Sequence, residues 1–176
     1  MRKKLALLGV CFLSVSFSLC ASADILPPGT HELGGSAEIA FPEDGSSIYL
    51  GPRFGVVIAP GSELEFEMGY SRTSDGLSNS RLAFLADFIY NFETVSAPYP
   101  FMLAGFGFAR SHSEWERGGL EYEGDETNGM LNLGAGLRLP VTESGLVRLE
   151  LRYTREFATP DVSTTTLRAG LSLLLD

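Results

Sequence analysis

The sequence predicts an all-β protein, an eight-stranded antiparallel up-and-down transmembrane β-barrel. Three observations lead to this fold class. Polar and apolar residues alternate with a period of two in eight segments of roughly ten residues, the length that a tilted strand needs to cross a bilayer. No stretch after Ala23 has the 18 or more consecutive apolar residues of a spanning helix. The charges on the polar face of the segments balance by sign.

The first element, residues 1–23, is predicted to be a secretory signal peptide and lies outside the fold. Positive charges at residues 2–4 precede an apolar run from Leu5 to Leu19, and residues 21–23 offer a small-residue cleavage site. An uncleaved membrane anchor is one alternative, but the apolar run is short for a spanning helix. Lipidation at Cys20 is another, although Leu19 stands where a lipoprotein signal has a small residue.

Residues 24–176 form the predicted barrel domain, which is acidic and lacks cysteine. Both cysteines, Cys11 and Cys20, lie in the signal peptide, and ten arginines face 22 acidic residues, giving a net charge of −12. Export without disulfides favours the envelope of a Gram-negative cell. The acidic balance argues against nucleic acid as a partner, because nucleic-acid binders present a basic face.

The predicted barrel runs from Thr30 to Leu175, and each strand except the fifth has one apolar and one polar or glycine-rich face. In segment 99–110 both faces are apolar or glycine, so its orientation stays open. Pro52 lies inside the second segment, and because proline cannot donate to the strand ladder we predict a bulge there. In chain order the segments are 33–41, 48–58, 64–71, 81–91, 99–110, 131–139, 147–154 and 166–175.

The connections predict a meander with both termini on one side. From a periplasmic N-terminus, connections 42–46, 72–80, 111–128 and 158–163 lie outside the cell, and connections 59–62, 93–98 and 140–144 lie inside. The longest connection, Ser111–Asn128, then falls on the outer side, as is typical of membrane barrels.

The polar face decides between a soluble and a membrane barrel. It carries five arginines and five acids: Glu38, Arg53, Glu65, Glu67, Asp87, Arg138, Arg148, Glu150, Arg152 and Arg168. A narrow packed lumen needs such a balance, because an unpaired buried charge is costly. The opposite face is Leu, Phe, Val and Ile, with tyrosines towards the strand ends, as on a lipid-facing surface. We therefore predict a lumen that is filled by charged side chains and is not an open pore, with a gate or proton path as the alternative.

Three segments carry a family resemblance: 98–111 (PYPFMLAGFGFARS), 131–154 (LNLGAGLRLPVTESGLVRLELRYT) and 164–175 (TTTLRAGLSLLL). They resemble the porin family of outer membrane β-barrel domains, the group around the OmpA and OmpX membrane domains. The resemblance implies an outer membrane location, insertion by the barrel insertion machinery, contact with outer membrane lipids and lipopolysaccharide, and a monomer. It brings no catalytic motif and no cofactor. The chain departs from the family at its end, which reads Leu-Leu-Leu-Asp over residues 173–176 where the family has a terminal aromatic residue.

The leading function is a non-enzymatic structural or surface-interaction role, and two alternatives stay open. One is a small-solute channel, which the filled lumen disfavours. The other is an outer membrane lipid hydrolase using His112, because Ser111-His112-Ser113-Glu114 holds the residue types of a hydrolase triad. Neighbouring side chains do not converge on one point, so this alternative lacks the required geometry. His31 precedes the first strand and is interpreted as an exposed linker residue.

The connection Ser111–Asn128 is the predicted recognition surface. It carries the only tryptophan, Trp115, together with Arg117 and Tyr122, and connections longer than about 12–15 residues are usually functional or disordered. The alternative is a hairpin that only extends the two flanking strands. Six acids between Glu114 and Glu126 offer oxygen ligands for a divalent cation, but no EF-hand spacing occurs, and we predict no metal site.

Overall fold

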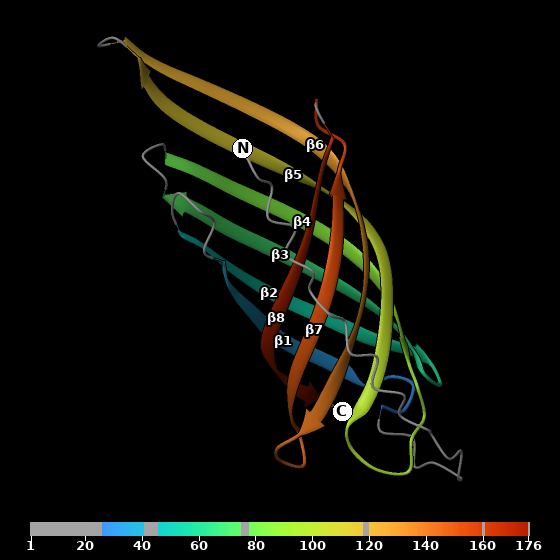
Figure 1. Cartoon of the computed structure of the whole chain (residues 1–176). Helices are drawn as coiled ribbons and strands as arrows, with labels where there is room; N and C mark the ends of the chain where they lie inside the picture. Colours follow the sequence, from blue (N-terminus) through green and yellow to red (C-terminus); the bar gives the residue numbers. More distant parts are fainter. Residues whose placement is uncertain (1–25, 41–45, 75–77, 118–119, 160, 176) are drawn as a thin grey trace, which may run out of the picture.

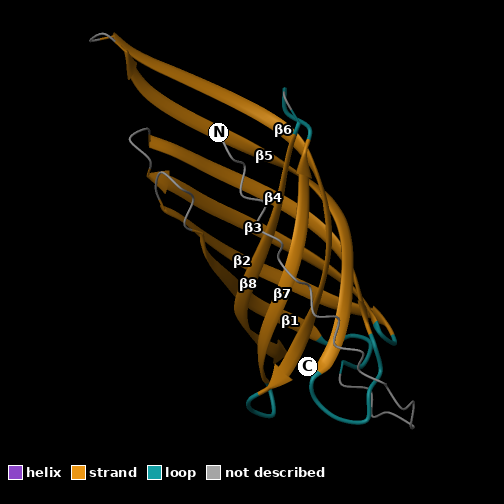
Figure 2. Cartoon of the chain, viewed as in Figure 1, coloured by secondary structure: helices purple, strands orange, loops and turns teal. Residues whose placement is uncertain are grey.

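Eight long strands with short connections build the whole of the described molecule (Figure 2). The computed structural model describes residues 26–40, 46–74, 78–117, 120–159 and 161–175, so the predicted signal peptide lies outside the described residues. Each strand pairs antiparallel with its neighbours in sequence, and the first strand pairs with the last to close a barrel. The predicted fold class, a closed eight-stranded up-and-down barrel, is confirmed. No helix of the described residues is long and apolar enough to span a membrane.

The strand bounds extend the predicted segments at several ends. The strands are β1 (His31–Ala40), β2 (Ser46–Ala59), β3 (Ser62–Ser74), β4 (Ser78–Asn91), β5 (Tyr99–Arg117), β6 (Leu120–Pro140), β7 (Gly145–Glu156) and β8 (Val162–Leu175).

The two ends of the barrel differ. His31 of β1 pairs with Leu175 of β8, so the first and last strands meet at what we call the terminal end. At the opposite end, the hairpin end, β5 and β6 run on past the other strands (Figure 1). Their pairing continues to Arg117 and Leu120, so the prediction of a connection over Ser111–Asn128 is wrong and the extended-hairpin alternative is correct. Apart from Trp115, Leu120 and Tyr122, the segment consists of polar residues and glycine, which is why its sequence resembles a loop.

The alternation of the sequence becomes an inside and an outside. Glutamates and arginines of the polar parity are buried in the barrel, whereas the leucines and phenylalanines of the other parity are exposed. Strand β5, whose orientation was open, turns its odd residues inward: Phe101, Leu103 and Ala109 are buried, whereas Phe106 and Phe108 are exposed. Its inward face is therefore apolar, unlike those of its neighbours.

Pro52 and Gly136 show how the pairing and packing of the strands depend on single residues. The expected bulge at Pro52 is wrong: the pairing of β2 with β3 lapses at Gly51 and Pro52 and then resumes in the same register, while β1 pairs with Pro52 through Gly35. The register shift lies nearer the turn, between Val57 and Ala59. Gly136 of β6 lies opposite Phe101, and a Cβ there would overlap the Phe101 ring.

The seam between β1 and β8 is short. Only the seven residues His31–Ala37 of β1 pair with β8, whereas β5 and β6 pair from Tyr99 to Arg117. Among the described residues, β1 and β8 therefore share fewer paired residues than any other two neighbouring strands of the barrel.

Candidate functional site: the charged barrel interior

The ten predicted interior charges come together inside the barrel. Nine of them are buried, and Glu38 is partly exposed towards the hairpin end. They come from every strand except β5. On each strand they occupy positions of one parity, because every second side chain of a strand points inward. Together with two further carboxylates, Glu32 and Glu63, they form what we call the charge network.

The terminal half of the charge network centres on Arg138 and Arg148. One Arg138 nitrogen lies 2.8 Å from Glu63 Oε2 and 3.0 Å from Glu32 Oε2. Arg148 is shared between two carboxylates, at 2.5 Å from Glu65 and 2.6 Å from Glu150. Each guanidinium thus links two carboxylates, which is the arrangement that makes a buried charge tolerable.

The other half centres on Arg152 and Arg168. Arg152 bonds to Glu150 and lies 3.1 Å from Asp87. Arg168 lies 2.9 Å from Glu67 and 3.2 Å from Glu38. Because Glu150 also binds Arg148, the two halves form one continuous set of ion pairs along the lumen.

Two aromatic rings support three of the guanidinium groups. The Arg148 guanidinium carbon lies 4.4 Å from the centroid of Phe101, and that of Arg138 lies 5.3 Å away. Arg168 lies 4.2 Å from the centroid of Tyr49, whose hydroxyl donates a hydrogen bond to Glu67. These contacts are cation–π interactions, which strengthen where water is excluded. The apolar inward face of β5 is therefore part of the site although it carries no charge there.

Glu32 and Glu63 were missed in the predicted set. They are 1% and 0% exposed, so the buried part of the interior holds six carboxylates against five guanidiniums, and the partly exposed Glu38 adds a seventh. The predicted balance of five against five is therefore incomplete. The signal was present, because Glu32 shares the parity of Glu38, and Glu63 shares that of Glu65 and Glu67.

Three of these carboxylates lie close enough to suggest a cation site. Single oxygens of Glu32, Glu63 and Glu65 lie within 4.8 Å of one another. However, Arg138 bridges Glu32 and Glu63, and Arg148 holds Glu65. Guanidinium groups already supply the positive charge there, so the geometry is that of an ion-pair network.

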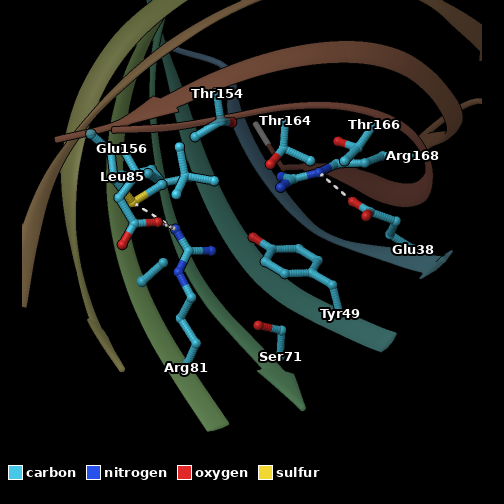
Figure 3. A pocket seen from close by; sticks show the side chains of 13 residues that line it. Glu38, Tyr49, Ser71, Arg81, Leu85, Thr154, Glu156, Thr164, Thr166 and Arg168 are labelled. Carbon is cyan, nitrogen blue, oxygen red and sulfur yellow. Dashed lines mark hydrogen bonds and ion pairs between the residues drawn. The ribbon is translucent and has the colours of Figure 1, made fainter. Parts of the chain in front are cut away.

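Above the charge network, towards the hairpin end, the barrel contains a cavity of about 260 Å³, which we call the vestibule (Figure 3). Its base includes Arg168 and Tyr49, and threonines of β7 and β8 form part of its wall. Long charged side chains fill the lumen below, whereas the vestibule is lined in part by the short side chains of Ser71, Ala83 and the threonines, which leave space.

His112 lies on the outer face of the extended hairpin, not in the lumen. Its Nδ1 lies 3.0 Å from Asp125 Oδ1 across the β5–β6 pair, and Arg110 donates to the same carboxylate at 2.9 Å. These hydrogen bonds, first that of Arg110 and then that of His112, hold the pKa of Asp125 below its usual range. Ser111 and Ser113 lie on the opposite face of β5 from His112, because successive strand residues alternate. The serines beside His112 in sequence therefore do not face it.

The three predicted contact residues of the hairpin lie in paired strand. Trp115 stands opposite Tyr122, and Arg117 is the last residue of β5. Their side chains, and the acids from Glu114 to Glu123, lie outside the part of the structure that is described. A role of this hairpin in recognition stays a prediction, as does the expectation that it holds no metal site.

Taken together, these features define a class: a closed eight-stranded barrel with an apolar outer surface and an ion-paired interior. Two solved structures are similar in fold. The N-terminal β-barrel domain of Pseudomonas aeruginosa OprF matches with a TM-score of 0.60 at 19% sequence identity, covering 84% of this chain and 98% of that one. Neisserial surface protein A matches with a TM-score of 0.52 at 20% identity, covering 82% and 95%. No protein-family model and no curated protein sequence matches the chain. The likeness is one of fold.

Proposed function

We propose that the chain is a non-enzymatic outer membrane protein with a structural or surface-interaction role and a closed lumen. The observation that carries the proposal is the charge network, because buried, mutually paired charges facing inward and apolar side chains facing outward suit a barrel surrounded by lipid. The similar fold of two barrels, one of them a Neisserial surface protein, supports the same location.

In this proposal the chain is exported by a cleaved signal peptide and inserted by the barrel insertion machinery as a monomer. The outward-facing leucines and phenylalanines contact outer membrane lipids. The terminal end faces the periplasm, and the β5–β6 hairpin faces the cell surface, where lipopolysaccharide surrounds it.

The lumen is closed because an eight-stranded barrel is only wide enough for its own side chains. The test is conductance of the purified barrel in planar bilayers, with a known open porin as the positive control. We expect no discrete openings. Stable, well-defined openings would establish the channel alternative and remove the closed-lumen part of the proposal.

The orientation has its own test. Trypsin added to intact cells should cut after Arg117, because two glycines follow it in the sequence and glycine-rich connections are preferred sites of proteolysis. Cutting only after the outer membrane is permeabilised would show that the hairpin faces the periplasm, and the hairpin could then not be a surface contact.

The hydrolase alternative is weaker because His112 has a carboxylate partner but its neighbouring serines face away. Lipid A deacylation by membranes that contain the wild type or His112→Ala separates the two classes. We expect no deacylation above background in either sample. An activity that is lost with His112→Ala would make the protein an enzyme.

A further inference from the structure

The charged side chains that line the vestibule form ion pairs with one another. Two ion pairs lie in its wall: Arg81 with Glu156 at 2.8 Å, and Arg168 with Glu38 at 3.2 Å. Each guanidinium is matched by a carboxylate within the same cavity, so the lining has no net formal charge. A free anion or a metal ion would have to break one of these pairs in order to bind.

Hydroxyl groups line the space between the two ion pairs. Figure 3 shows Thr154, Thr164 and Ser71 around the same space as the two arginines. Thr166 contributes a buried hydroxyl oxygen that has no hydrogen-bond partner among the described residues. Because Thr166 lines the cavity, a rotation of its side chain would let this hydroxyl donate to or accept from a bound molecule.

One part of the wall is apolar. Ala83, Leu85 and Met130 belong to a buried cluster that borders the vestibule opposite the threonines of β8. The cavity thus offers donors and acceptors on one side and hydrocarbon on another. Its volume of about 260 Å³ corresponds to roughly eight or nine water molecules at about 30 Å³ each, enough space for one sugar ring.

From this combination we infer that the vestibule binds a single neutral saccharide unit. A sugar hydroxyl both donates and accepts, so it can bond to a carboxylate and to a threonine or guanidinium without breaking the ion pair between them. The C–H face of the ring lies against the apolar wall. The unit is either a free monosaccharide or the end of a surface glycan, since both present the same chemistry.

The test uses the full mature barrel in detergent micelles and saturation-transfer NMR. One arm titrates free glucose, galactose, mannose and N-acetylglucosamine, and the other titrates lipopolysaccharide oligosaccharide freed of its lipid. We expect saturable transfer to at least one probe. A response confined to the first arm assigns the site to a free sugar, and a response confined to the second assigns it to a glycan end.

The variant Thr166→Val keeps the side-chain shape and removes the buried hydroxyl. We expect its affinity to fall about fivefold or more, the effect of losing one hydrogen bond. Thr165→Val is the matched control, because Thr165 faces outward on the same strand and should bind like the wild type. Circular dichroism checks that both variants are folded.

Two outcomes would overturn the inference: no saturable transfer from any probe, or equal losses in both variants, which would place the binding elsewhere. Neither outcome touches the proposed function, because the conductance and protease tests do not depend on a sugar.

Discussion

The terminal and hairpin halves of the lumen are built by the same strands, but the terminal half is filled by side chains and the hairpin half contains a cavity. In the terminal half, residues such as Arg148 and Glu65 meet from opposite walls and fill the interior. In the hairpin half, the inward positions of β8 are Thr164 and Thr166, and β4 contributes Ala83, so that a cavity remains. The comparison teaches that side-chain length at inward positions, and not strand number alone, determines whether a small barrel is filled.

The largest expected effect comes from shortening both partners of one ion pair in the filled half. Glu65→Ser with Arg148→Ser removes opposite charges together, so no net charge is added to the lumen. We expect discrete openings in planar bilayers, where the wild type has none. Thr164→Ser in the vestibule is the control and should leave the barrel closed. If the double variant is folded and also closed, then side-chain length does not govern the difference between the halves.

A single substitution at the centre of the charge network should be strongly destabilising. Arg152→Met leaves Asp87 without a guanidinium partner and takes one of two from Glu150, and breaking a buried ion pair in this way typically costs about 3–5 kcal/mol. Arg155→Met on the same strand is the control: Arg155 pairs with Asp161 on the exposed surface and should cost about 0–1 kcal/mol. Urea unfolding of the barrel in detergent measures both. Similar midpoints would mean that water reaches the charge network.

The aromatic support of the charge network predicts an intermediate effect. Phe101→Leu keeps an apolar side chain but removes the ring beneath Arg148, and we expect a loss of about 2 kcal/mol. Phe106→Leu is the matched control, because Phe106 lies on the outward face of the same strand. Both variants are compared by the same unfolding measurement. Equal losses would count against a contribution from the cation–π contact.

The smallest effect is expected on the hairpin, outside both halves of the lumen. Because hydrogen bonds depress the pKa of Asp125, its contacts are intact above the ordinary value of 3.8 and are lost only as the pH falls through a lower value. The carboxyl ¹³C shift of Asp125 should therefore change below pH 3.8, and Arg110→Gln should move this midpoint upward. A wild-type midpoint at or above 3.8 would contradict the hydrogen bonds of Asp125 with Arg110 and His112. Arg155→Gln, on a different strand pair, should leave the midpoint unchanged.

The architecture was predictable because burial in a barrel depends on parity, which the sequence carries directly. Eight alternating segments predicted eight strands, and the parity of residues such as Arg152 placed them inside. Strand β5 could not be oriented, since Phe101 and Phe106 look equally apolar in a sequence although one packs on guanidiniums and the other is exposed. The sequence of the hairpin resembles a loop because it has too few apolar residues to show a hydrophobic alternation.

The candidate site was predictable in composition but not in arrangement. Parity identified the charged residues, whereas the pairing of Arg138 with Glu63 depends on the stagger of strands that are far apart in sequence. The vestibule was not predicted at all. A cavity results from the summed lengths of side chains on several strands, and the alternation of any one strand contains no such information.

The short seam between β1 and β8 also has a consequence for how the barrel assembles. The contacts across it join the two ends of the chain, as Arg53 does with Ser172 and Arg168 does with Glu38, over 119 and 130 residues of sequence. Such distant partners meet only when the last strand is in place. Until β8 pairs with β1, Arg168 lacks its partner Glu38. We therefore expect the interior to lose its water in the same step in which β1 pairs with β8. These long-range contacts form only in the closed barrel, and they stabilise it.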